Sequence, residues 1–343
     1  MQKRVTVNTL AKQLGVNPST VSRAFAPNSG ISDEVRKKIL DLAQKEGYKP
    51  NKAASRLTMK EIRIGILIND VYPESFSEFT RGIKDAYERF YDYKISYDIL
   101  IFKNTEQDEE HAKAYFERFN DFDGLIVSGL TSKEMAKELI NYSENHKNIV
   151  SLQSETKDLP YLFSSSHDGS TASSMAAQFL AIALSKSESK NVVLFTGSKI
   201  LEVHQDSERS FRKTCEEYGL NLCAVYDMDD DDDILLNQAQ ELFNQKDVDG
   251  IYISSGKSIS LCKFIKNHGL ADKVTLVTSD TYPTLNEFVE DGTVQATVYQ
   301  NFHDLAYNAF ALLVQKIVDK ADIPTKISPR PEMVIKSNLH LYR

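Results

Sequence analysis

The sequence lacks the short motifs that mark common catalytic and nucleotide-binding sites. It contains no HExxH, GxSxG, GxGxxG or P-loop pattern, and its 7 histidines do not cluster. Nothing therefore pairs a nucleophile with a general base. The three cysteines, Cys215, Cys223 and Cys262, are odd in number and lack the spacing of a metal site or a CxxC pair, so we expect reduced thiols. The sequence predicts a protein that is not an enzyme and that holds no cofactor or metal.

Long hydrophobic runs are also absent. No apolar stretch approaches the roughly 20 residues that a membrane-spanning helix needs. Residues 1–4 lead directly into a predicted helix, without the apolar core of a signal peptide. We therefore expect a cytoplasmic location.

Charge is distributed unevenly along the chain. Residues 1–60 carry 12 Lys and Arg against 4 Asp and Glu, whereas residues 61–343 carry 29 against 45. A polyanion attracts a local cluster of cations, because neutralising phosphates releases condensed counterions. The acidic remainder is repelled by the same polyanion. The pattern predicts that the first 60 residues contact nucleic acid and that the rest does not.

The N-terminal segment has the pattern of a helix-turn-helix. Thr6 is placed to cap a first helix whose apolar stripe includes Leu10, and Gly15 follows as the turn residue. Asn17 then occupies an N-cap position. Pro18 takes the first helical position after it, where a missing N–H costs nothing. The pattern predicts two short helices joined by a tight turn.

The second of these helices presents a small, polar and basic face. Val16 and Val21 are spaced to pack inward, which leaves four residues to face a partner: Ser19, Thr20, Ser22 and Arg23. A helix of this kind suits the major groove of DNA. Ser32 is placed to cap a third helix that ends at Gly47. An ordinary helical hairpin is the alternative.

Residues 5–57 resemble the DNA-binding head of the lactose-repressor (LacI-type) family of bacterial transcription regulators. The matching positions are Val16, Thr20–Arg23, Ile31–Ser32, Val35–Ile39, Gly47–Asn51, Ala54 and Leu57. The resemblance implies a helix-turn-helix head over 1–49, a hinge helix over 50–60 and a two-lobed effector-binding and dimerisation domain over 61–343. It also implies that the hinge folds on operator DNA and that Leu57 wedges into the minor groove. The alternative is a linker leucine that packs on the body.

The resemblance also assigns DNA contacts. Groove contacts are expected from Pro18 to Thr20 and from Arg23, which can read a guanine edge or hold a phosphate. The full set of expected DNA contacts is Thr6, Asn17, Pro18, Ser19, Thr20, Ser22, Arg23, Asn28, Ser32, Asn51, Ala54 and Leu57. Pro18 and Ser19 are short where some relatives carry long polar readers, and Ser55 replaces a common hinge arginine. The operator sequence therefore stays open.

Strands and helices alternate from residue 62 onward. Ile64–Ile68 is a continuous apolar run, as in a strand that is buried on both faces. Further strands are expected over 95–102, 124–127, 149–152, 192–195, 222–226, 250–253, 274–278, 333–335 and 339–341. Helices are expected over 76–90, 106–119, 170–184, 206–218, 234–243 and 302–318. Such alternation predicts parallel sheets, and the length exceeds one ordinary core.

The predicted fold is a small all-α helix-turn-helix head with a hinge helix, followed by an α/β body of two doubly wound parallel-sheet lobes. The body resembles the periplasmic sugar-binding proteins. Ligands of such sheets bind beyond the carboxyl ends of the strands, in the cleft between lobes. Aromatic rings and short hydrogen-bonding groups in these loops suit a polyol. The expected effector-binding residues are Tyr72, Phe76, Phe79, Gln153, Ser207, Ser255, Asp280, Gln300 and Phe302.

The resemblance gives three of these residues specific roles. Asp280 matches an aspartate that accepts ligand hydroxyls, Gln300–Phe302 match a cleft and stacking segment, and Gln153 matches a ligand-contacting position. Loop capping or packing between the lobes is the alternative for each. Many relatives also grip the effector with an arginine, and this chain has Ser207 at that position. Arg209, His204 or Asp206 are possible substitutes, so the effector is expected to be atypical, phosphorylated or absent.

Residues 227–233 contain six aspartates. The segment lacks the glycine and the distal glutamate of a calcium-binding loop. We predict a solvated loop whose charges repel one another.

These features predict a ligand-responsive repressor of a carbohydrate-utilisation operon that binds a pseudo-palindromic operator as a homodimer. No heptad tail follows Arg343, which favours a dimer over a tetramer. Effector binding is expected to change hinge folding, so that effector and DNA alter each other's affinity by the same factor. Two alternatives stay open: a regulator with a purine or other non-sugar metabolite as corepressor, and a sugar-processing enzyme fused to a DNA-binding head.

Overall fold

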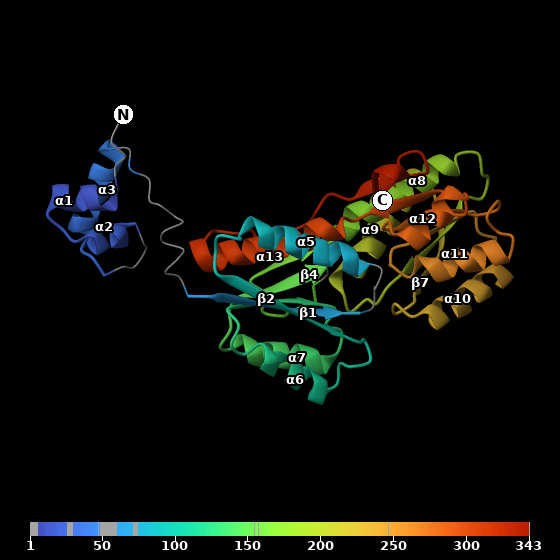
Figure 1. The fold of residues 1–343 in the computed structure, drawn as a ribbon. Helices are drawn as coiled ribbons and strands as arrows, with labels where there is room; N and C mark the ends of the chain where they lie inside the picture. Colours follow the sequence, from blue (N-terminus) through green and yellow to red (C-terminus); the bar gives the residue numbers. More distant parts are fainter. Residues whose placement is uncertain are drawn as a thin grey trace. The chain divides into compact units, whose positions relative to one another are not determined.

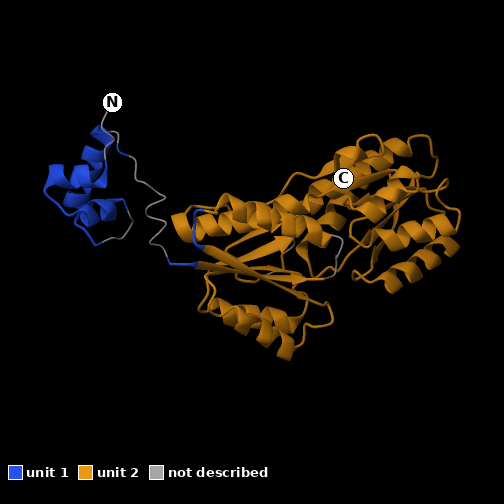
Figure 2. Cartoon of the chain, in the orientation of Figure 1, with its two compact units in different colours: residues 1–61, 92–94 blue, residues 62–91, 95–343 orange. Residues whose placement is uncertain are grey.

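The computed structural model describes residues 6–25, 30–46, 48, 60–70, 75–153, 155–156, 158–245 and 247–342. It divides into one unit of residues 1–61 with 92–94 and a second unit of residues 62–91 with 95–343 (Figure 2). Below, the head is the helical part of the first unit (residues 6–48), and the body is the second unit. Five of the expected contact residues lie outside the described residues, as does most of the predicted hinge: Asn28, Asn51, Ala54, Leu57 and Tyr72.

The head contains three described helices: α1 (Val7–Leu14), α2 (Pro18–Ala24) and α3 (Asp33–Lys45). Thr6 caps α1 in a capping box with Thr9, and Gly15 ends the helix with a left-handed φ of 65°. Asn17 is the N-cap residue of α2, as predicted, although its side chain makes no capping hydrogen bond. The Ser32 hydroxyl accepts the Val35 N–H at the start of α3. Local sequence signals therefore set the ends of these helices.

A small apolar core holds the three head helices together. Its buried members are Leu10, Ala11, Val21, Ala24, Ile39 and Ala43. Val16 packs against this cluster from the turn, and the Phe25 and Tyr48 rings meet with their centroids 5.6 Å apart. Because Val21 and Ala24 face inward, the intervening residues of α2 face solvent.

The first lobe of the body is a six-stranded sheet in the order β11-β5-β4-β3-β1-β2. Its strands are β1 (Ile62–Asn69), β2 (Ile95–Phe102), β3 (Gly124–Ser128), β4 (Ile149–Gln153), β5 (Phe163–Ser166) and β11 (Lys326–Ile327). All neighbouring strands in it run parallel. Helices α5 and α13 cover one face, and α6 and α7 cover the other (Figure 1). These helices are α5 (Phe76–Arg89), α6 (Glu109–Arg118), α7 (Lys133–Ser143) and α13 (Phe302–Asp319).

The second lobe repeats this plan in the order β12-β10-β9-β8-β6-β7. Its strands are β6 (Asn191–Thr196), β7 (Asn221–Asp227), β8 (Gly250–Ile253), β9 (Thr275–Ser279), β10 (Ala296–Tyr299) and β12 (Glu332–Val334). Only β12 runs antiparallel to its neighbour among the described pairs. Its helices are α8 (Gly169–Ala183), α9 (Glu202–Tyr218), α10 (Asp232–Gln245), α11 (Ser258–Asn267) and α12 (Pro283–Glu290).

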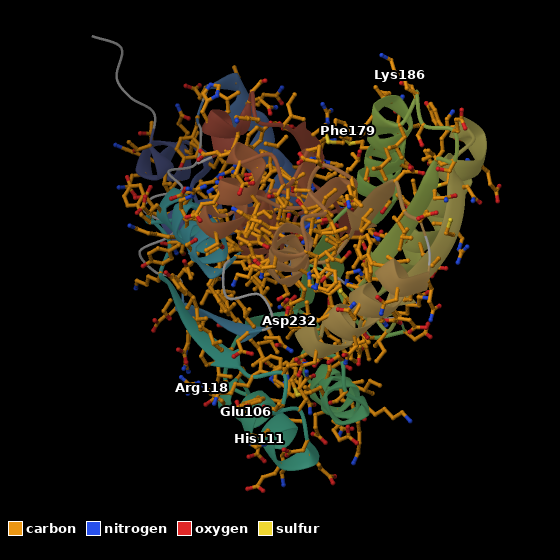
Figure 3. All side chains as sticks on the ribbon, turned by 90° about the vertical axis from the view of Figure 1, so that its right-hand side faces the viewer. Glu106, His111, Arg118, Phe179, Lys186 and Asp232 are labelled. Carbon is orange, nitrogen blue, oxygen red and sulfur yellow. The ribbon has the colours of Figure 1, made fainter. Side chains whose placement is uncertain are left out.

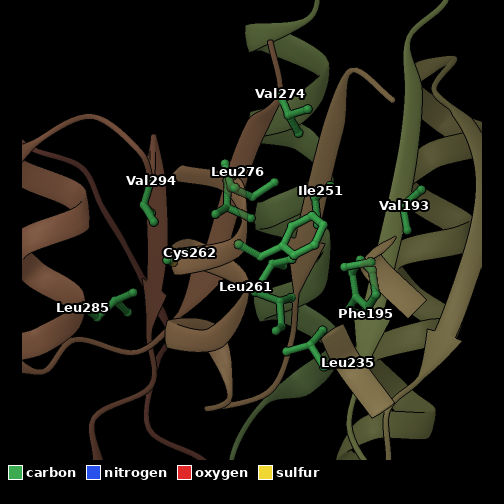
Figure 4. Packing of buried hydrophobic residues seen from close by; sticks show 14 of the residues in the cluster. Val193, Phe195, Leu235, Ile251, Leu261, Cys262, Val274, Leu276, Leu285 and Val294 are labelled. Atoms are coloured by element: carbon green, nitrogen blue, oxygen red, sulfur yellow. The ribbon is translucent and has the colours of Figure 1, made fainter. Parts of the chain in front are cut away.

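Successive strand residues supply the two faces of the second sheet. Val193 and Phe195 enter one apolar cluster together with residues of α10 to α12 (Figure 4). Val192 and Leu194 enter another cluster together with residues of α8 and α9. Since neighbouring side chains on a strand point to opposite faces, a sheet that is covered on both sides needs continuously apolar strands. The apolar run at β6 thus follows from its position between β8 and β7, where helices cover both faces of the sheet.

The chain passes between the two sheets three times, after β5, after β10 and between β11 and β12. The sequence predicted most of the strands and helices within a few residues, but it missed α7, α11, α12, β5, β10 and β11. The strand predicted over 339–341 is wrong, because Leu339–Tyr342 forms a 3-10 helix, η2, with Leu339 buried against the second lobe. The predicted fold class of two parallel-sheet lobes is confirmed.

Charged side chains project from the body on several of its helices. Arg118 at the end of α6 and Lys186 beyond α8 both project from its surface (Figure 3). Among the described helices, none has the length and the apolar composition that a membrane-spanning helix requires.

Candidate effector cavity and DNA-binding face

A cavity of about 230 Å³ opens between the two lobes of the body. Each of the strands β1 to β10 contributes to its lining at or just after its last residue, so the cavity lies at the carboxyl ends of both sheets. The lining residues are Asn69, Ser75, Asn104, Ser128, Gly129, Thr131, Gln153, His167, Ser198, Ile200, Leu201, Val203, His204, Ser207, Asp229, Asp230, Tyr252, Ser254, Ser255, Gly256, Asp280, Tyr282, Gln300 and Phe302.

The first lobe contributes a neutral wall, formed by Asn69, Asn104, Ser128 and Gln153. The Asn69 amide donates to Asn104 Oδ1 and to the Gly129 carbonyl, both at 3.0 Å. The Ser128 hydroxyl donates to Gln153 Oε1 at 3.1 Å. These hydrogen bonds fix the amides and hydroxyls that a ligand would meet on this side.

The second lobe contributes an acidic wall, formed by Asp229, Asp230, Asp280 and His204. Asp230 Oδ1 accepts the Ser255 hydroxyl at 2.7 Å, and its Oδ2 accepts the Ser198 N–H at 3.2 Å. Only 9% of the Asp230 side chain is exposed. The prediction of a solvated loop over 227–233 is therefore wrong at Asp230, because donors after β6 and β8 draw its carboxylate inward.

Glycine is required next to this carboxylate. A Cβ atom on Gly197 would overlap Asp230 Oδ1 and would lie 2.6 Å from His204 Nε2. The Asp230 carboxylate and the His204 ring thus both occupy the space beside the Gly197 backbone. No side chain fits at position 197 without displacing one of them.

Asp280 is the most deeply buried carboxylate of the acidic wall, with 3% of the residue exposed. Burial raises its pKa to about 7, and hydrogen bonds from Gln300 only partly oppose this rise. The Gln300 amide lies 3.5 Å from both carboxylate oxygens. At neutral pH this group is therefore divided between its charged and neutral forms.

Two histidines line the cavity in their neutral forms. Burial lowers the pKa of His167 to about 3 and also lowers the pKa of His204, although Asp230 opposes the shift at His204. His204 Nε2 lies 3.9 Å from Asp230 Oδ2, beyond hydrogen-bonding distance. Within the described part of the chain, neither histidine has a hydrogen-bond partner at Nδ1. Buried polar atoms of this kind often accompany a binding site.

Left-handed backbone also concentrates at this cavity. Gln153, Asp229, Asp230, Asp280 and Asn301 have φ angles of 76°, 48°, 55°, 71° and 54°. Each is a lining residue or, in the case of Asn301, lies between two lining residues. Such conformations are costly for residues other than glycine and tend to persist at functional sites. The backbone therefore supports a binding role for these strand ends.

The structure brings together six of the nine expected effector residues: Gln153, Ser207, Ser255, Asp280, Gln300 and Phe302 all line the cavity. Phe76 and Phe79 do not line it. Phe79 is buried and packs edge-on against Phe302, with the ring centroids 5.1 Å apart, so it supports the wall from behind. Their position after the first strand suggested that their rings would face a polyol, but Phe79 instead packs against Phe302 of α13.

Ser207 is buried and its hydroxyl donates to the Gly169 carbonyl at 3.4 Å. Of the three proposed substitutes for the missing arginine, only His204 lines the cavity. Arg209 is exposed and pairs with Asp206. His167 and Asp230 also line the cavity, although they are not among the expected effector residues. The chain crossing after β5 would have signalled His167, whereas no local pattern distinguishes Asp230 from its five neighbouring aspartates.

On the head, the described residues among the expected DNA contacts are exposed or half-buried. Asn17, Pro18, Ser19, Ser22 and Arg23 are exposed, and Thr20 is half-buried. Thr6 and Ser32 are also exposed and cap the N-termini of α1 and α3, where backbone N–H groups favour a phosphate. The Ser22 hydroxyl donates to the Pro18 carbonyl at 3.2 Å in the free protein.

Metal binding gains no support from the described residues, since no group of three or more His, Cys, Asp or Glu side chains among them is placed to hold an ion. Cys215 and Cys262 are buried and Cys223 is half-buried, and none of the three is part of a disulfide.

Two family models match the chain. Residues 64–321 match the periplasmic binding protein domain, and residues 6–51 match the bacterial regulatory proteins of the lacI family. The HTH-type transcriptional regulator RegA of Clostridium saccharobutylicum is 32% identical over 138 residues, which cover 39% of this chain and 40% of the relative. Catabolite control protein A of Staphylococcus epidermidis is 27% identical over 221 residues, which cover 64% of this chain and 63% of the relative. The chain thus spans less than two thirds of these relatives.

Solved structures share the fold of the body. GanP, a glucose-galactose binding protein from Geobacillus stearothermophilus, matches with a TM-score of 0.69 at 21% identity, over 82% of this chain and 99% of that one. A solute binding protein from Burkholderia graminis in complex with D-arabinose matches with a TM-score of 0.71 at 18% identity, over 83% and 99%. These similarities confirm the periplasmic-binding-protein-like fold that the sequence predicted.

Proposed function

Because this chain belongs to the lacI family of bacterial regulatory proteins and has the body of a periplasmic binding protein, we propose that it is a ligand-responsive, sequence-specific DNA-binding repressor. The operon that it controls serves carbohydrate utilisation. The chain acts in the cytoplasm as a homodimer on a pseudo-palindromic operator, and it is not an enzyme.

One observation carries this proposal: a helix-turn-helix with an exposed polar and basic face is joined to a body that holds a cavity at its strand ends. The cavity is smaller than the roughly 300–1,000 Å³ that suits drug-sized ligands. It offers amides, hydroxyls and the aromatic rings of Tyr252, Tyr282 and Phe302. That combination fits a monosaccharide-sized effector. The solved structures with glucose-galactose, arabinose or allose in their names have bodies of the same fold.

The proposed mechanism is linkage between two sites. The cavity is formed by strand ends of both lobes, so an effector that contacts both walls favours one arrangement of the lobes over another. If the hinge folds in only one arrangement, effector and operator change each other's affinity by the same factor, on the order of 5- to 150-fold. An inducing sugar would lower operator affinity, whereas a corepressor would raise it.

Operator selection from a random DNA library, followed by fluorescence anisotropy with the full chain, tests this proposal. We expect the selected DNA to bind at least a hundredfold more tightly than scrambled DNA, with an affinity that falls steeply with salt. We also expect one sugar to change that affinity at least fivefold. Equal affinity for selected and scrambled DNA would contradict the proposal.

The hinge gives a sharper mutational test. Leu57→Ala is expected to lower affinity for the selected operator at least tenfold and to leave affinity for scrambled DNA nearly unchanged, because only a specific complex includes a kinked base step. The matched control is Leu341→Ala, which removes an exposed leucine from the body. An equal loss of affinity for the selected operator and for scrambled DNA would show that Leu57 does not act as a wedge in the minor groove.

A further inference from the structure

In addition to the three chain crossings, the two lobes meet directly at a short seam. The backbone of Thr156, in the loop after β4, pairs with that of Leu201, in the loop after β6, as an isolated antiparallel bridge. Next to this bridge, the Glu202 N–H donates to the Glu155 carbonyl at 3.2 Å. Two residues of the first lobe thus make main-chain contact with two residues of the second, and these four residues are the seam.

The seam borders the cavity on both sides. Leu201 is itself a lining residue. In the first lobe, the Thr156 hydroxyl donates to the Leu130 carbonyl at 2.6 Å, and Leu130 lies between the lining residues Gly129 and Thr131. Because the seam joins a lining segment of one lobe to a lining segment of the other, it fixes the separation of the two walls at this edge of the cavity.

The seam also completes the N-terminus of α9. A helix begins with N–H groups that have no partner within the helix, and a polar side chain at the N-cap position usually accepts one of them. Leu201 holds the N-cap position of α9, and its side chain makes no capping hydrogen bond. The Glu155 carbonyl of the other lobe instead accepts the first of these donors, the Glu202 N–H. Moving the lobes apart would therefore break a hydrogen bond that the cap of α9 cannot replace.

One lysine lies between the two glutamates of the seam. Lys326 Nζ, from β11 of the first lobe, lies 3.8 Å from Glu155 Oε1 and 3.9 Å from Glu202 Oε2. The Glu155 carboxylate also accepts the Ser164 hydroxyl of β5, which holds it in place. Two carboxylates from different lobes that share one lysine are close enough to repel each other when the lysine is removed. Lys326 thus decides whether charge favours contact or separation at the seam.

We propose that the seam and Lys326 form a latch that holds the two lobes in the arrangement in which both walls of the cavity are complete. The main-chain hydrogen bond gives the latch its geometry, and the lysine gives it most of its strength. The latch itself is a property of the body alone. Its consequence for DNA rests on the proposed function, because a change in the arrangement of the lobes alters operator affinity only if the hinge responds to it.

Double electron–electron resonance on the full chain tests the latch without effector or DNA. Spin labels at Ile140→Cys on α7 and Asn237→Cys on α10 report the separation of the lobes, because both positions are exposed and belong to different lobes. Cys223→Ser removes the half-buried thiol, whereas Cys215 and Cys262 are buried. Excess unlabelled chain suppresses distances between protomers of a dimer. We expect one narrow distance distribution for this labelled parent.

A charge reversal then opens the latch. Lys326→Glu places a third carboxylate at the seam and is expected to shift the maximum of the distance distribution and at least double its width. Lys326→Met removes the cation without adding a charge, so a smaller change of the same kind is expected. It also guards against a folding defect that is specific to the reversal.

The matched control is Lys263→Glu, which makes the same change of charge at an exposed position of α11 in the second lobe. We expect it to leave the distribution of the labelled parent unchanged. An unchanged distribution in both Lys326 variants would overturn the latch. The same shift in Lys326→Glu and Lys263→Glu would overturn it as well, because net charge would then be the cause.

Operator binding separates this inference from the proposed function. We expect Lys326→Glu to change affinity for the selected operator at least threefold relative to Lys263→Glu. A shifted distance distribution with equal operator affinity would uphold the latch and contradict the proposed linkage. An unchanged distribution in a protein whose operator affinity responds to a sugar would overturn the latch and uphold the proposed function.

Discussion

The two walls of the cavity differ in charge although strand ends of the same kind form both. On the neutral wall, Asn69 and Ser128 donate hydrogen bonds to other uncharged groups of the same lobe. On the acidic wall, Asp230 is held by a backbone N–H and a hydroxyl, and Asp280 meets a glutamine amide. The scaffold therefore fixes where ligand-binding groups lie, and the residues that end each strand decide their charge.

The two walls also differ in the free energy that burying their polar groups costs the folded protein. Uncharged amides and hydroxyls that bond to one another are buried at little cost. A buried carboxylate without a cation is costly, and the pKa of Asp280 near 7 expresses that cost. The acidic wall is thus the destabilised side of the cavity, as is common where a site is prepared for a ligand.

The largest effect should come from removing the buried charge of the acidic wall. In the unfolded chain Asp280 ionises near its ordinary pKa, and in the native state near 7, so the wild-type free energy of unfolding falls as the pH rises through that interval. Asp280→Asn removes this penalty and tolerates the left-handed backbone. The free energy of unfolding of the variant, minus that of wild type, should rise by roughly 2–3 kcal/mol from pH 5 to pH 8. Denaturant unfolding of the full chain at the two pH values measures this difference.

Asp249→Asn is a control in which the lost carboxylate has a lowered pKa, whereas the pKa of Asp280 is raised. Although burial acts to raise the pKa of Asp249, hydrogen bonds from the Ser189 hydroxyl and the Asn191 N–H outweigh it and lower the pKa below its ordinary value. Its stabilising contribution is complete above the ordinary pKa of an aspartate. This variant should therefore be less stable than wild type by the same amount at pH 5 and pH 8. If the difference in free energy of unfolding between Asp280→Asn and wild type were the same at pH 5 and pH 8, Asp280 would not be the costly group.

A somewhat smaller effect is expected from disturbing the shape of the acidic wall. Gly197→Ala places a methyl group against Asp230 and His204, so one of them must move. Overpacking of this kind costs on the order of 1–3 kcal/mol, and we expect a 10- to 100-fold loss of affinity for any effector. Calorimetry measures the loss, and operator affinity without effector, which depends on the head, serves as the control. Unchanged effector affinity would mean that the ligand does not reach this wall.

The smallest effect should come from the neutral wall. Ser128→Ala removes the hydroxyl that donates to Gln153, an interaction worth about 1 kcal/mol. We expect roughly fivefold weaker binding of the effector sugar, measured by calorimetry. Unchanged affinity would mean that this hydrogen bond does not position a group that the ligand contacts.

Much of the head could be predicted because its signals are local. Thr6, Gly15, Pro18 and Ser32 act on the nearest turns of the backbone, and each lies where the sequence placed it. In the body, β2 was predicted with the observed bounds because branched and aromatic residues dominate it, although Ser96 and Asp98 interrupt them. The missed strand β5, Phe163–Ser166, is mostly serine and is a strand only because β4 and β11 flank it.

The cavity shows the same division between local and distant causes. Because parallel strands end at one edge, the sequence order alone predicted that Gln153 and Asp280 would lie at the carboxyl ends of the strands. Gln300 was expected only from the family resemblance, because β10 was not predicted. Which of the six aspartates over 227–233 would point into the cavity could not be predicted in this way. The donors that bury Asp230 come from Ser198 and Ser255, which lie about 30 residues before it and 25 after it.

The sequence by itself determined the helix-turn-helix, the alternation that builds two parallel-sheet lobes and the edge at which the strands end. Each of these depends on periodicity, capping or turn residues that act over a few positions. Only the tertiary structure decided that Phe79 supports a wall that it does not line, that Asp230 is buried, and that the cavity has one neutral and one acidic wall. These outcomes depend on which distant donors and side chains meet in space, and hydrogen bonding and burial act on that proximity regardless of separation along the chain.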